Sequence, residues 1–401
     1  MPDLEKLLAD RTQLMGTNAI REILKVVSLP GMVSLAGGIP APESFPMEIF
    51  GELTEKVLSK YGSKALQYDL TEGFSPLRDA LPDYLKRLGV TAVSDEILVG
   101  SGSQGVLDGL GMALLSKGDK VAVEAPTYLG AIQAFNPYEP QYVQLASDES
   151  GPIPESLEAA LKKERIKFVY LVPTFQNPTG RTIPLERRQR IAKIIMEQGA
   201  LLVEDDPYSA LRYRGEHIPP VKHFAPDNVV YISTLSKILA PGLRVGFSVA
   251  PPPIRHWLVL VKQGVDLHTS TFNQALAAEY LSGGYLERHL PQILKLYRPR
   301  QAAMLAALGR YFPDSVCWSK PAGGMFLWVE GPAGLDMEAV YHKAVARKTA
   351  FVPGRFFYAK KGAGLSTMRL NFTMADEETI EWAVKIIGEV LKEEIAGNYC
   401  C

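Results

Sequence analysis

The sequence has few cysteines, no long apolar run and almost no net charge, and each lack excludes a class of protein. Its three cysteines, Cys317, Cys400 and Cys401, are too few and too badly spaced for a disulfide framework, which indicates a reducing compartment. No run approaches the roughly 18 consecutive apolar residues of a membrane-spanning helix, and the N-terminus MPDLEKLLADRTQ is charged where a signal peptide is apolar. We therefore expect a cytoplasmic protein with no membrane partner.

The charge balance also argues against a nucleic-acid partner. A net charge of −1 over 401 residues provides no basic field for nucleic acid or for an anionic membrane. The six histidines show no metal-ligand spacing, so the sequence predicts no metal site. With 47% hydrophobic residues, a chain of this length can bury a large core and is expected to form more than one domain.

Between residues 96 and 250, short apolar runs alternate with longer amphipathic ones. This pattern predicts an α/β fold with a mainly parallel sheet and helices on both faces. Strands are expected at EILVG (96–100), KVAVEAP (120–126), QYVQLA (141–146), FVYLVPT (168–174), LLVEDD (201–206), VVYIST (229–234) and RVGFSVA (244–250). Helices are expected at VLDGLGMALL (106–115), SLEAALKKE (156–164) and PLERRQRIAKIIMEQG (184–199).

The C-terminal part has a different pattern, which predicts a second, smaller α+β domain. A long helical stretch near 276–309 leads into GGMFLWVEG, AFVPG and STMRLNF, strands mixed with helices. We expect an N-terminal arm at 1–45 that contributes to the small domain and the active site, and that contains a helix near NAIREILKVV. The large domain is expected at 46–295 and the small domain at 296–401.

A glycine-rich turn, GSGSQG at residues 100–105, follows the first strand and opens a helix. With Glu124 at the end of the next strand, it matches the dinucleotide-binding fingerprint G-x-G-x-x-G and suggests a nicotinamide dehydrogenase. However, free N–H groups and a helix dipole can hold any phosphate. Ser103 and Gln104 add donors that suit a single phosphate monoester, so the motif alone leaves the ligand class open.

Polar residues follow the ends of the later strands. Asn177 lies in the turn FQNPTG, and LLVEDDPY ends in three acids, residues 204–206, before Tyr208. Because three acids at the end of a buried strand cannot all face water, at least one is expected to meet a cationic partner. Lys237 and Arg244 follow the next strand. Taken singly, these residues could be turn residues, helix caps or solvated charges.

Together, these residues suggest one site, because the carboxyl ends of parallel strands meet at one edge of a sheet. A phosphate cradle, an acid, an amide, a tyrosine and a lysine are what pyridoxal phosphate (PLP) chemistry requires. The lysine forms a Schiff base with the aldehyde, and a buried carboxylate keeps the ring nitrogen protonated. Since only the neutral amine is a nucleophile, Lys237 is expected to be partly desolvated and close to another cation.

At these residues the sequence resembles the fold-type I, class I/II aminotransferases, over essentially the whole chain. It is most similar to the 2-aminoadipate/kynurenine aminotransferase group in the following segments: AIREILKV, SLAGGIPAPESFP, ALQYDLTEGFSPLR, SGSQ, EAPTYLGAIQAF, PTFQNPTG, VEDDPY, LSKILAPGLRVG, KQGVDLHTS, GGMFLWVE and MRLNF. The resemblance implies the PLP-dependent transferase fold, with the large domain binding the cofactor.

The resemblance also implies a role for each candidate residue. Lys237 would form the Schiff base, Asp205 would pair with the pyridine nitrogen, and Tyr128 would stack on the ring. The remaining cofactor contacts would come from Asn177 and Tyr208 at the ring oxygen, and from Ser103, Gln104, Ser236 and Arg244 at the phosphate. Thr234 stands where relatives commonly carry serine, and its hydroxyl can make the same bond. Tyr68 would reach the phosphate of the neighbouring subunit in a homodimer.

Three residues are candidates for binding the substrate, together with Asn177. Arg369 alternates with apolar residues in STMRLNF, so it points away from the face that they bury, and from the residues alone it could be a surface arginine. By resemblance it grips the substrate α-carboxylate, a bidentate contact of roughly 1.5 to 3 kcal/mol. Backbone groups around Gly38 would close over the same carboxylate. Arg21 would read an acidic side chain, or it is an ordinary exposed helical charge.

The expected reaction is a ping-pong transfer of the amino group of an L-amino acid to a 2-oxo acid, most often 2-oxoglutarate. The donor could be of the 2-aminoadipate, aromatic, branched or acidic type. Besides the dehydrogenase, two alternatives stay open: a PLP-dependent lyase or decarboxylase of the same fold, and a non-catalytic effector-binding domain such as some transcription factors carry. Such factors have an N-terminal DNA-binding domain, for which we expect no room here, because the match begins near the N-terminus.

Overall fold

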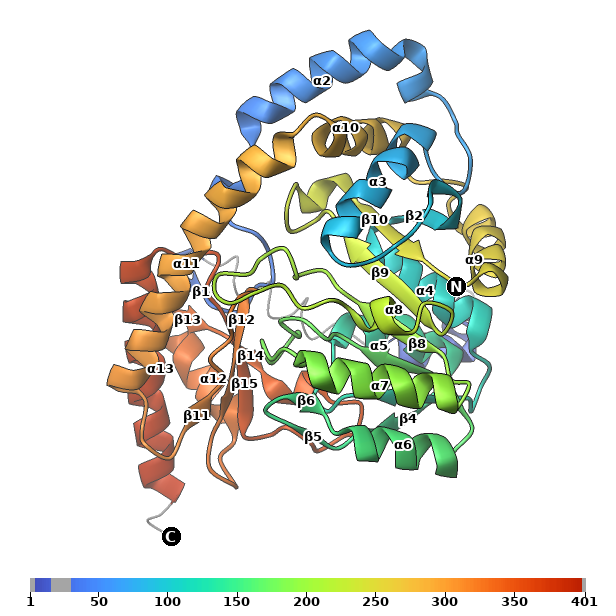
Figure 1. Ribbon diagram of the computed structural model, residues 1–401. Coiled ribbons are helices and arrows are strands. Elements are labelled where there is room, and N and C mark those ends of the chain that lie inside the picture. The colour runs from blue at the N-terminus through green and yellow to red at the C-terminus, as the bar shows by residue number, and fades with distance from the viewer. Residues whose placement is uncertain (1–3, 16–29, 399–401) are drawn as a thin grey trace.

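The computed structural model describes residues 4–15 and 30–398. In these ranges a seven-stranded sheet runs through the large part of the molecule in the order β2-β10-β9-β8-β7-β3-β4 (Figure 1). Its strands are β2 (Ile97–Ser101), β3 (Lys120–Val123), β4 (Gln141–Gln144), β7 (Ile166–Leu171), β8 (Leu202–Asp205), β9 (Val229–Thr234) and β10 (Val245–Val249). All neighbouring pairs are parallel except those of β10, which is antiparallel to both β2 and β9.

Helices cover both faces of this sheet, as the sequence predicts. Along β7, Phe168 and Tyr170 pack with residues of α4, α5 and α9, whereas Val169 and Leu171 pack with residues of α6, α7 and α8. The bounds of these helices are α4 (Gly102–Leu114), α5 (Leu129–Phe135), α6 (Pro154–Lys163), α7 (Leu185–Glu197), α8 (Val221–Phe224) and α9 (Pro252–Val265). Burial on both faces explains why the strands are apolar throughout rather than alternating.

The β2 and β10 end of the sheet is covered by α3 (Ser75–Arg87) and α10 (Thr271–Ser282), with α2 (Met47–Tyr61) beside α10 (Figure 1). The single helical stretch predicted near 276–309 is in fact two helices, α10 and α11 (Tyr285–Tyr311). They separate at Gly283 and Gly284, and Gly284 has a left-handed φ of 72° that favours glycine. A second helix therefore begins in a new direction.

A smaller antiparallel sheet, in the order β11-β12-β15-β14, lies beside α11 (Figure 1). Its elements and neighbours are β11 (Cys317–Trp318), β12 (Phe326–Glu330), β14 (Val352–Pro353), β15 (Thr367–Asn371), α12 (Met337–Ala346) and α13 (Glu377–Asn398). A parallel pair, β1 (Val33–Ser34) with β13 (Thr349–Ala350), joins the N-terminal region to this part. The domain boundaries stay a prediction, since α11 is continuous across residue 295.

The remaining elements are short. They are the strands β5 (Ser147–Asp148) and β6 (Gly151–Pro152), and the 3-10 helices Leu4–Leu7, Asp10–Leu14, Pro42–Ser44, Gly62–Leu66, Ser94–Glu96, Asn136–Tyr138, Pro241–Leu243 and Gly354–Phe357. The helix predicted near 18–27 lies outside the described residues. Among the helices in the described ranges, none is both long and apolar enough to cross a membrane.

Candidate active site

A cavity of about 270 Å³ lies beyond the carboxyl ends of β7, β8 and β9, next to the start of α4. It brings together most of the residues singled out from the sequence: Gly38, Ser103, Gln104, Tyr128, Asn177, Asp205, Tyr208, Thr234, Ser236, Lys237, Arg244 and Arg369. These residues come from distant parts of the chain, and the parallel strands carry most of them to the same edge of the sheet.

Lys237 reaches into this cavity from the turn after β9. Its Nζ donates a hydrogen bond of 3.0 Å to the Gly38 carbonyl oxygen, which ties the N-terminal region to the lysine. Burial, followed by the positive charges of Arg244 and Arg369, lowers the pKa of Lys237 from its ordinary value to about 8. The neutral, nucleophilic form of the amine is therefore far more populated near neutral pH than in an ordinary lysine, which agrees with the desolvation and nearby positive charge that the sequence predicts.

Asp205 is the last residue of β8, and only one oxygen of its buried carboxyl group has a hydrogen-bond partner among the described residues. Its Oδ2 accepts a hydrogen bond of 2.8 Å from the Tyr170 hydroxyl, whereas Oδ1 has no partner among the described residues. Burial raises the pKa of Asp205 to about 7, and the nearby charge of Asp206 acts in the same direction. A buried oxygen without a partner is costly, so this site is built to receive a donor from a bound group.

Arg369 lines the same cavity and is buried, so a surface role for it is wrong. Its guanidinium donates to Asn177 Oδ1 at 2.8 Å and to the Ala36 carbonyl oxygen at 2.7 Å. Its Cζ lies 4.3 Å from the ring centre of Phe326 and 4.9 Å from that of Phe357, which fixes the plane of the fork. Burial lowers the pKa of Arg369 to about 10.

Tyr208 and Tyr128 supply the aromatic part of the site. The Asn177 side chain donates to the Tyr208 hydroxyl at 3.4 Å, and burial raises the pKa of Tyr208 above its ordinary value. Tyr128 precedes α5, and burial raises its pKa to about 12. Both phenols are therefore protonated at neutral pH and can donate hydrogen bonds to an oxygen in the cavity.

The other end of the cavity is shaped for an anion. Ser103 lies in the first turn of α4, where backbone N–H groups lack intrahelical partners. Arg244 lies against Gly102, and its Nη2 is 3.4 Å from the Ser101 carbonyl oxygen. A side chain at Gly102 would clash with Arg244, and one at Gly246 would clash with the backbone of residues 102 and 103. The two glycines thus keep this cradle open.

Three further side chains line the cradle. The Thr234 hydroxyl lies 2.9 Å from Ser236 Oγ and accepts from the Ser236 N–H at 3.1 Å, so the threonine found in place of serine braces Ser236. The Gln104 side-chain amide donates to the Gly130 carbonyl oxygen at 2.8 Å. This contact holds the first turn of α4 against the turn that carries Tyr128.

Three predicted residues are not among the described residues that line the cavity. Tyr68 is 77% exposed and does not line this cavity, and Arg21 lies outside the described residues. Glu124, the acid of the dinucleotide fingerprint, is buried away from the cavity lining, and its Oε2 accepts from the Val172 N–H at 3.4 Å. Burial raises the pKa of Glu124 to about 8. Glu124 is therefore not placed to bind a ribose in this cavity.

Sequence reasoning missed the remaining lining residues, which are Ala36, Gly37, Ile39, Val172, Pro207, Pro241 and Val352. Most of them lie within a few positions of a predicted residue in the sequence, and this proximity would have been enough to identify them. Val352 has no such signal, because the second sheet brings it to the site. Tyr170, whose hydroxyl donates to Asp205, was also missed, because it lies within an apolar strand and looks like an ordinary core residue.

The aminotransferase class I and II family matches residues 49–387 of this chain. The chain belongs to this family. It is 45% identical over 400 residues to the aromatic-amino-acid aminotransferase 1 of Thermococcus litoralis, covering 98% of this chain and 96% of that protein.

Two solved aminotransferase structures each match 98% of this chain and 99% of their own. The kynurenine aminotransferase of Pyrococcus horikoshii, in complex with PMP, has a TM-score of 0.94 at 44% identity. The alpha-aminoadipate aminotransferase of Thermus thermophilus, complexed with N-(5'-phosphopyridoxyl)-L-leucine, has a TM-score of 0.91 at 39% identity. The predicted fold-type I aminotransferase is confirmed, and the dehydrogenase interpretation is wrong.

Proposed function

We propose that this aminotransferase moves the amino group of an L-amino acid to a 2-oxo acid, 2-oxoglutarate in particular, with PLP as its cofactor. One observation carries the proposal. A single cavity holds both a lysine whose pKa is lowered to about 8 and a buried aspartate with an oxygen that lacks a partner. An amine nucleophile and a carboxylate that awaits a proton donor are the two groups that this chemistry needs.

The residues present fit PLP. Asp205 Oδ1 suits the N–H of a protonated pyridine, and the cradle at Gly102 and Gly246, with Arg244 over it, suits the phosphate. When bound, PLP supplies an aldehyde that exchanges amines and a ring that accepts electrons from the substrate Cα. The PMP and phosphopyridoxyl-leucine bound in the two related structures support this assignment.

The chain itself provides orientation and proton transfer. Lys237 Nζ takes the proton from the donor Cα and later returns a proton, since a pKa of about 8 serves both directions near neutral pH. The Asn177 amide and the Tyr208 hydroxyl, which are bonded to each other, would donate to the oxygen on the cofactor ring. Tyr128, whose ring is held beside Gly130, would stack on the cofactor. Ser103, Thr234 and Ser236 would hold the phosphate.

The substrate carboxylate binds Arg369, while Gly38 and Asn177 lie next to it. Lys237, Arg244 and Arg369 are the cations among the described lining residues, and each already has a partner in this scheme. The side chain of the donor then meets apolar groups of the cavity such as Ile39 and Val352. We therefore propose that the amino donor has an aromatic or branched side chain. If a donor with an acidic side chain is also accepted, Arg21 is the candidate to bind that side chain.

We further propose a homodimer with shared active sites. Tyr68 is the residue that would cross to the phosphate of the partner. It is 77% exposed, and its neighbours in the chain Leu66 and Leu70 are exposed as well. Adjacent exposed apolar side chains are typical of a surface that another protein covers.

The test uses the purified chain loaded with PLP. We expect a visible absorbance from the lysine-bound cofactor, which phenylalanine, leucine or 2-aminoadipate should bleach in the absence of an acceptor. Each bleached site should release one equivalent of 2-oxo acid, and 2-oxoglutarate should restore the absorbance. A chain that stays colourless after PLP is supplied would contradict the proposal, and so would a donor that is consumed with release of carbon dioxide or ammonia.

A further inference from the structure

The loop that carries Tyr68 is held on both sides of that residue, by the first residue of α10 and by the turn that precedes it. On one side, the Thr271 hydroxyl donates to the Gln67 carbonyl oxygen at 2.9 Å. On the other side, the Asp69 N–H donates to His268 Nε2 at 3.4 Å. The Tyr68 ring meets the His268 ring edge to face, with centroids 5.7 Å apart. An exposed tyrosine is thus given a defined position.

The partners of His268 determine its tautomer. Its Nδ1 lies 2.8 Å from the Thr269 carbonyl oxygen, which can only accept, so Nδ1 carries the hydrogen. Its Nε2 faces the Asp69 N–H, which can only donate, so Nε2 is the acceptor. Nδ1 is therefore the donor and Nε2 the acceptor, and a flip of the imidazole ring would break both hydrogen bonds.

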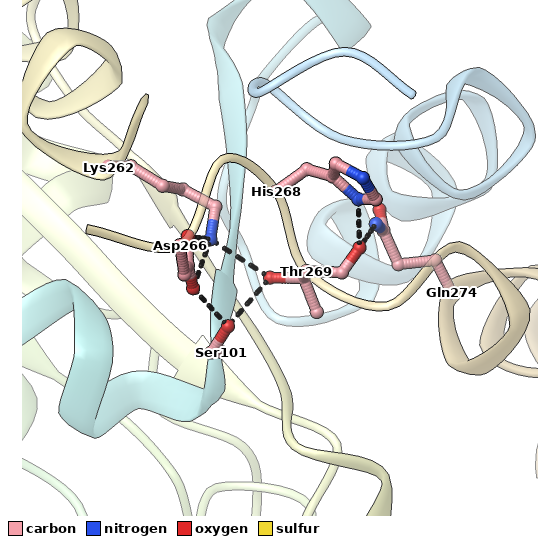
Figure 2. Close-up of polar contacts among 6 residues, drawn as sticks. All are labelled: Ser101, Lys262, Asp266, His268, Thr269 and Gln274. Carbon is pink, nitrogen blue, oxygen red and sulfur yellow. Dashed lines mark hydrogen bonds and ion pairs between the residues drawn. The ribbon is translucent and has the colours of Figure 1, made fainter. Parts of the chain in front are cut away.

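The same turn is bonded to the start of the phosphate cradle, as Figure 2 shows. The Thr269 carbonyl oxygen also accepts from Gln274 Nε2 at 2.6 Å, and Thr269 Oγ1 lies 3.2 Å from Ser101 Oγ. The Ser101 hydroxyl donates to Asp266 Oδ2 at 2.6 Å. Lys262 Nζ donates to both Asp266 and Thr269. Since Ser101 directly precedes α4, one hydrogen-bonded network joins His268 to the cradle of its own subunit.

The backbone residue before His268 has a strained conformation, which supports a functional role for this turn. Leu267 has a φ of 60°, a left-handed conformation that a leucine rarely adopts, and its side chain is exposed. Such strain persists only where the surrounding contacts enforce it, and it concentrates at functional sites. Here the enforcing contacts are those of Asp266 on one side and of His268 and Thr269 on the other.

We propose that His268 is a positioning residue: its Nδ1–H tautomer holds Tyr68 in place to bind the cofactor phosphate of the partner subunit, and Thr269 and Ser101 couple it to the cradle of its own subunit. The proposal rests on the proposed function, because it needs both the PLP cofactor and the homodimer. Tyr68 is then the group that contacts the cofactor, and His268 acts only through it.

The test is a double-mutant cycle on the PLP dissociation constant of the full chain, measured by visible absorbance. Loss of one hydrogen bond to a phosphate predicts that Y68F weakens binding about tenfold. H268N, which keeps a donor near Nδ1 but has no acceptor at Nε2, is expected to weaken binding about fivefold in the wild type and to have almost no further effect in Y68F. H268Q, whose side-chain oxygen reaches the Nε2 position, should restore most of the affinity.

H256N is the matched control, because His256 is exposed on α9 and outside this network, and it should bind PLP as the wild type does. If H268N and Y68F weaken binding independently, so that their factors multiply, the positioning role is overturned. It is also overturned if H268N binds with wild-type affinity. These results differ from failure of the proposed function, in which the wild type itself would bind no PLP.

Discussion

An arginine, a carboxylic acid and a lysine, each buried or half-buried, occur together in two regions of this aminotransferase, and their hydrogen-bonding atoms are satisfied to different degrees. One region, the closed cluster, consists of Arg188 on α7, Glu204 on β8 and Lys222 on α8. The other is the cavity. The pairs to compare, with the residue of the closed cluster first, are Arg188 and Arg369, Glu204 and Asp205, and Lys222 and Lys237.

In the closed cluster every charged group has its partners within the chain. Both oxygens of Glu204 accept backbone N–H groups, those of Val221 and Lys222, at 2.8 Å. Lys222 Nζ donates to the carbonyl oxygens of Pro226 and Val229. The guanidinium of Arg188 donates to five oxygens, which are the Thr174 hydroxyl and the backbone carbonyl oxygens of Ile183, Ile218, Pro219 and Pro173. Such groups stabilise the fold and have nothing left to offer a ligand.

At the cavity, the arginine, the acid and the lysine have atoms that can still form hydrogen bonds. Arg369 Nε and Asp205 Oδ1 have no partner in the described part of the chain, and Lys237 Nζ bonds to one carbonyl oxygen. The pKa does not separate the two regions, because burial raises the pKa of both Glu204 and Asp205 to about 7. What separates them is hydrogen-bond satisfaction. Within these three pairs, a polar atom without a partner therefore distinguishes the cavity from the closed cluster better than the pKa does.

The lysine pair gives the largest expected contrast. K237A should lower turnover by about 10⁴-fold, because it removes both the nucleophile and the proton carrier, with no loss of unfolding midpoint. K222A should keep turnover but lower the unfolding free energy by about 1 to 3 kcal/mol, since one buried and one partly buried carbonyl group lose their donor. Steady-state kinetics and urea unfolding on both variants measure this. The comparison fails if K222A loses turnover while it remains fully folded.

The arginine pair should give the next largest effect. R369Q should lower kcat/KM for the amino donor by about 100-fold, because it removes a charge-assisted fork that grips the carboxylate. R188Q, in which several carbonyl groups lose their donors, should instead unfold at lower urea concentration and keep kcat/KM in the folded fraction. R369K sharpens the test, since lysine keeps the charge but not the fork, and it should recover only part of the activity. Full recovery would mean that charge alone is needed.

The sequence predicts the strands of this fold well, because each apolar run is bounded by turn residues and is buried on both faces. It does not predict that β10 is antiparallel, because a buried apolar strand reads the same in either direction. It also does not separate α10 from α11, since a glycine pair within an apolar periodicity can be tolerated in a helix or can end it.

The site was predictable as a set of residues but not in its detail. From the sequence, any of the acids at 204–206 could have been the functional one, and only the family resemblance selected Asp205. The structure supplies the reason: Glu204 and Asp205 follow each other in β8 and so point to opposite faces, one beneath α8 and the other into the cavity. The rings around Arg369 and the hydrogen bond between Asp69 and His268 join segments that are apart in the chain, which no local pattern reveals.

The pH dependence of stability sharpens the lysine comparison without any ligand. Folding lowers the pKa of Lys237 from 10.5 to about 8, mainly through burial, so the charged amine destabilises the folded chain below pH 8. As the pH rises from 8 to 10.5 the unfolded chain binds more protons, and this penalty, roughly 3 kcal/mol, disappears. K237M should therefore be more stable than the PLP-free wild type at pH 7.5 and should lose that advantage by pH 10.5. Urea unfolding at several pH values measures the difference, and a constant difference would contradict the burial of a charged amine.

The acid pair should give the smallest effect. D205N should weaken PLP binding about tenfold, because the amide replaces a carboxylate that pairs with a charged N–H. E204Q should leave PLP affinity unchanged and lower the urea midpoint, since its side chain can no longer accept both backbone N–H groups equally well. Absorbance titration with PLP and unfolding of the PLP-free variants measure the two effects separately. If D205N binds PLP as the wild type does and unfolds more easily, Asp205 belongs with the closed cluster, and hydrogen-bond satisfaction does not identify the functional acid.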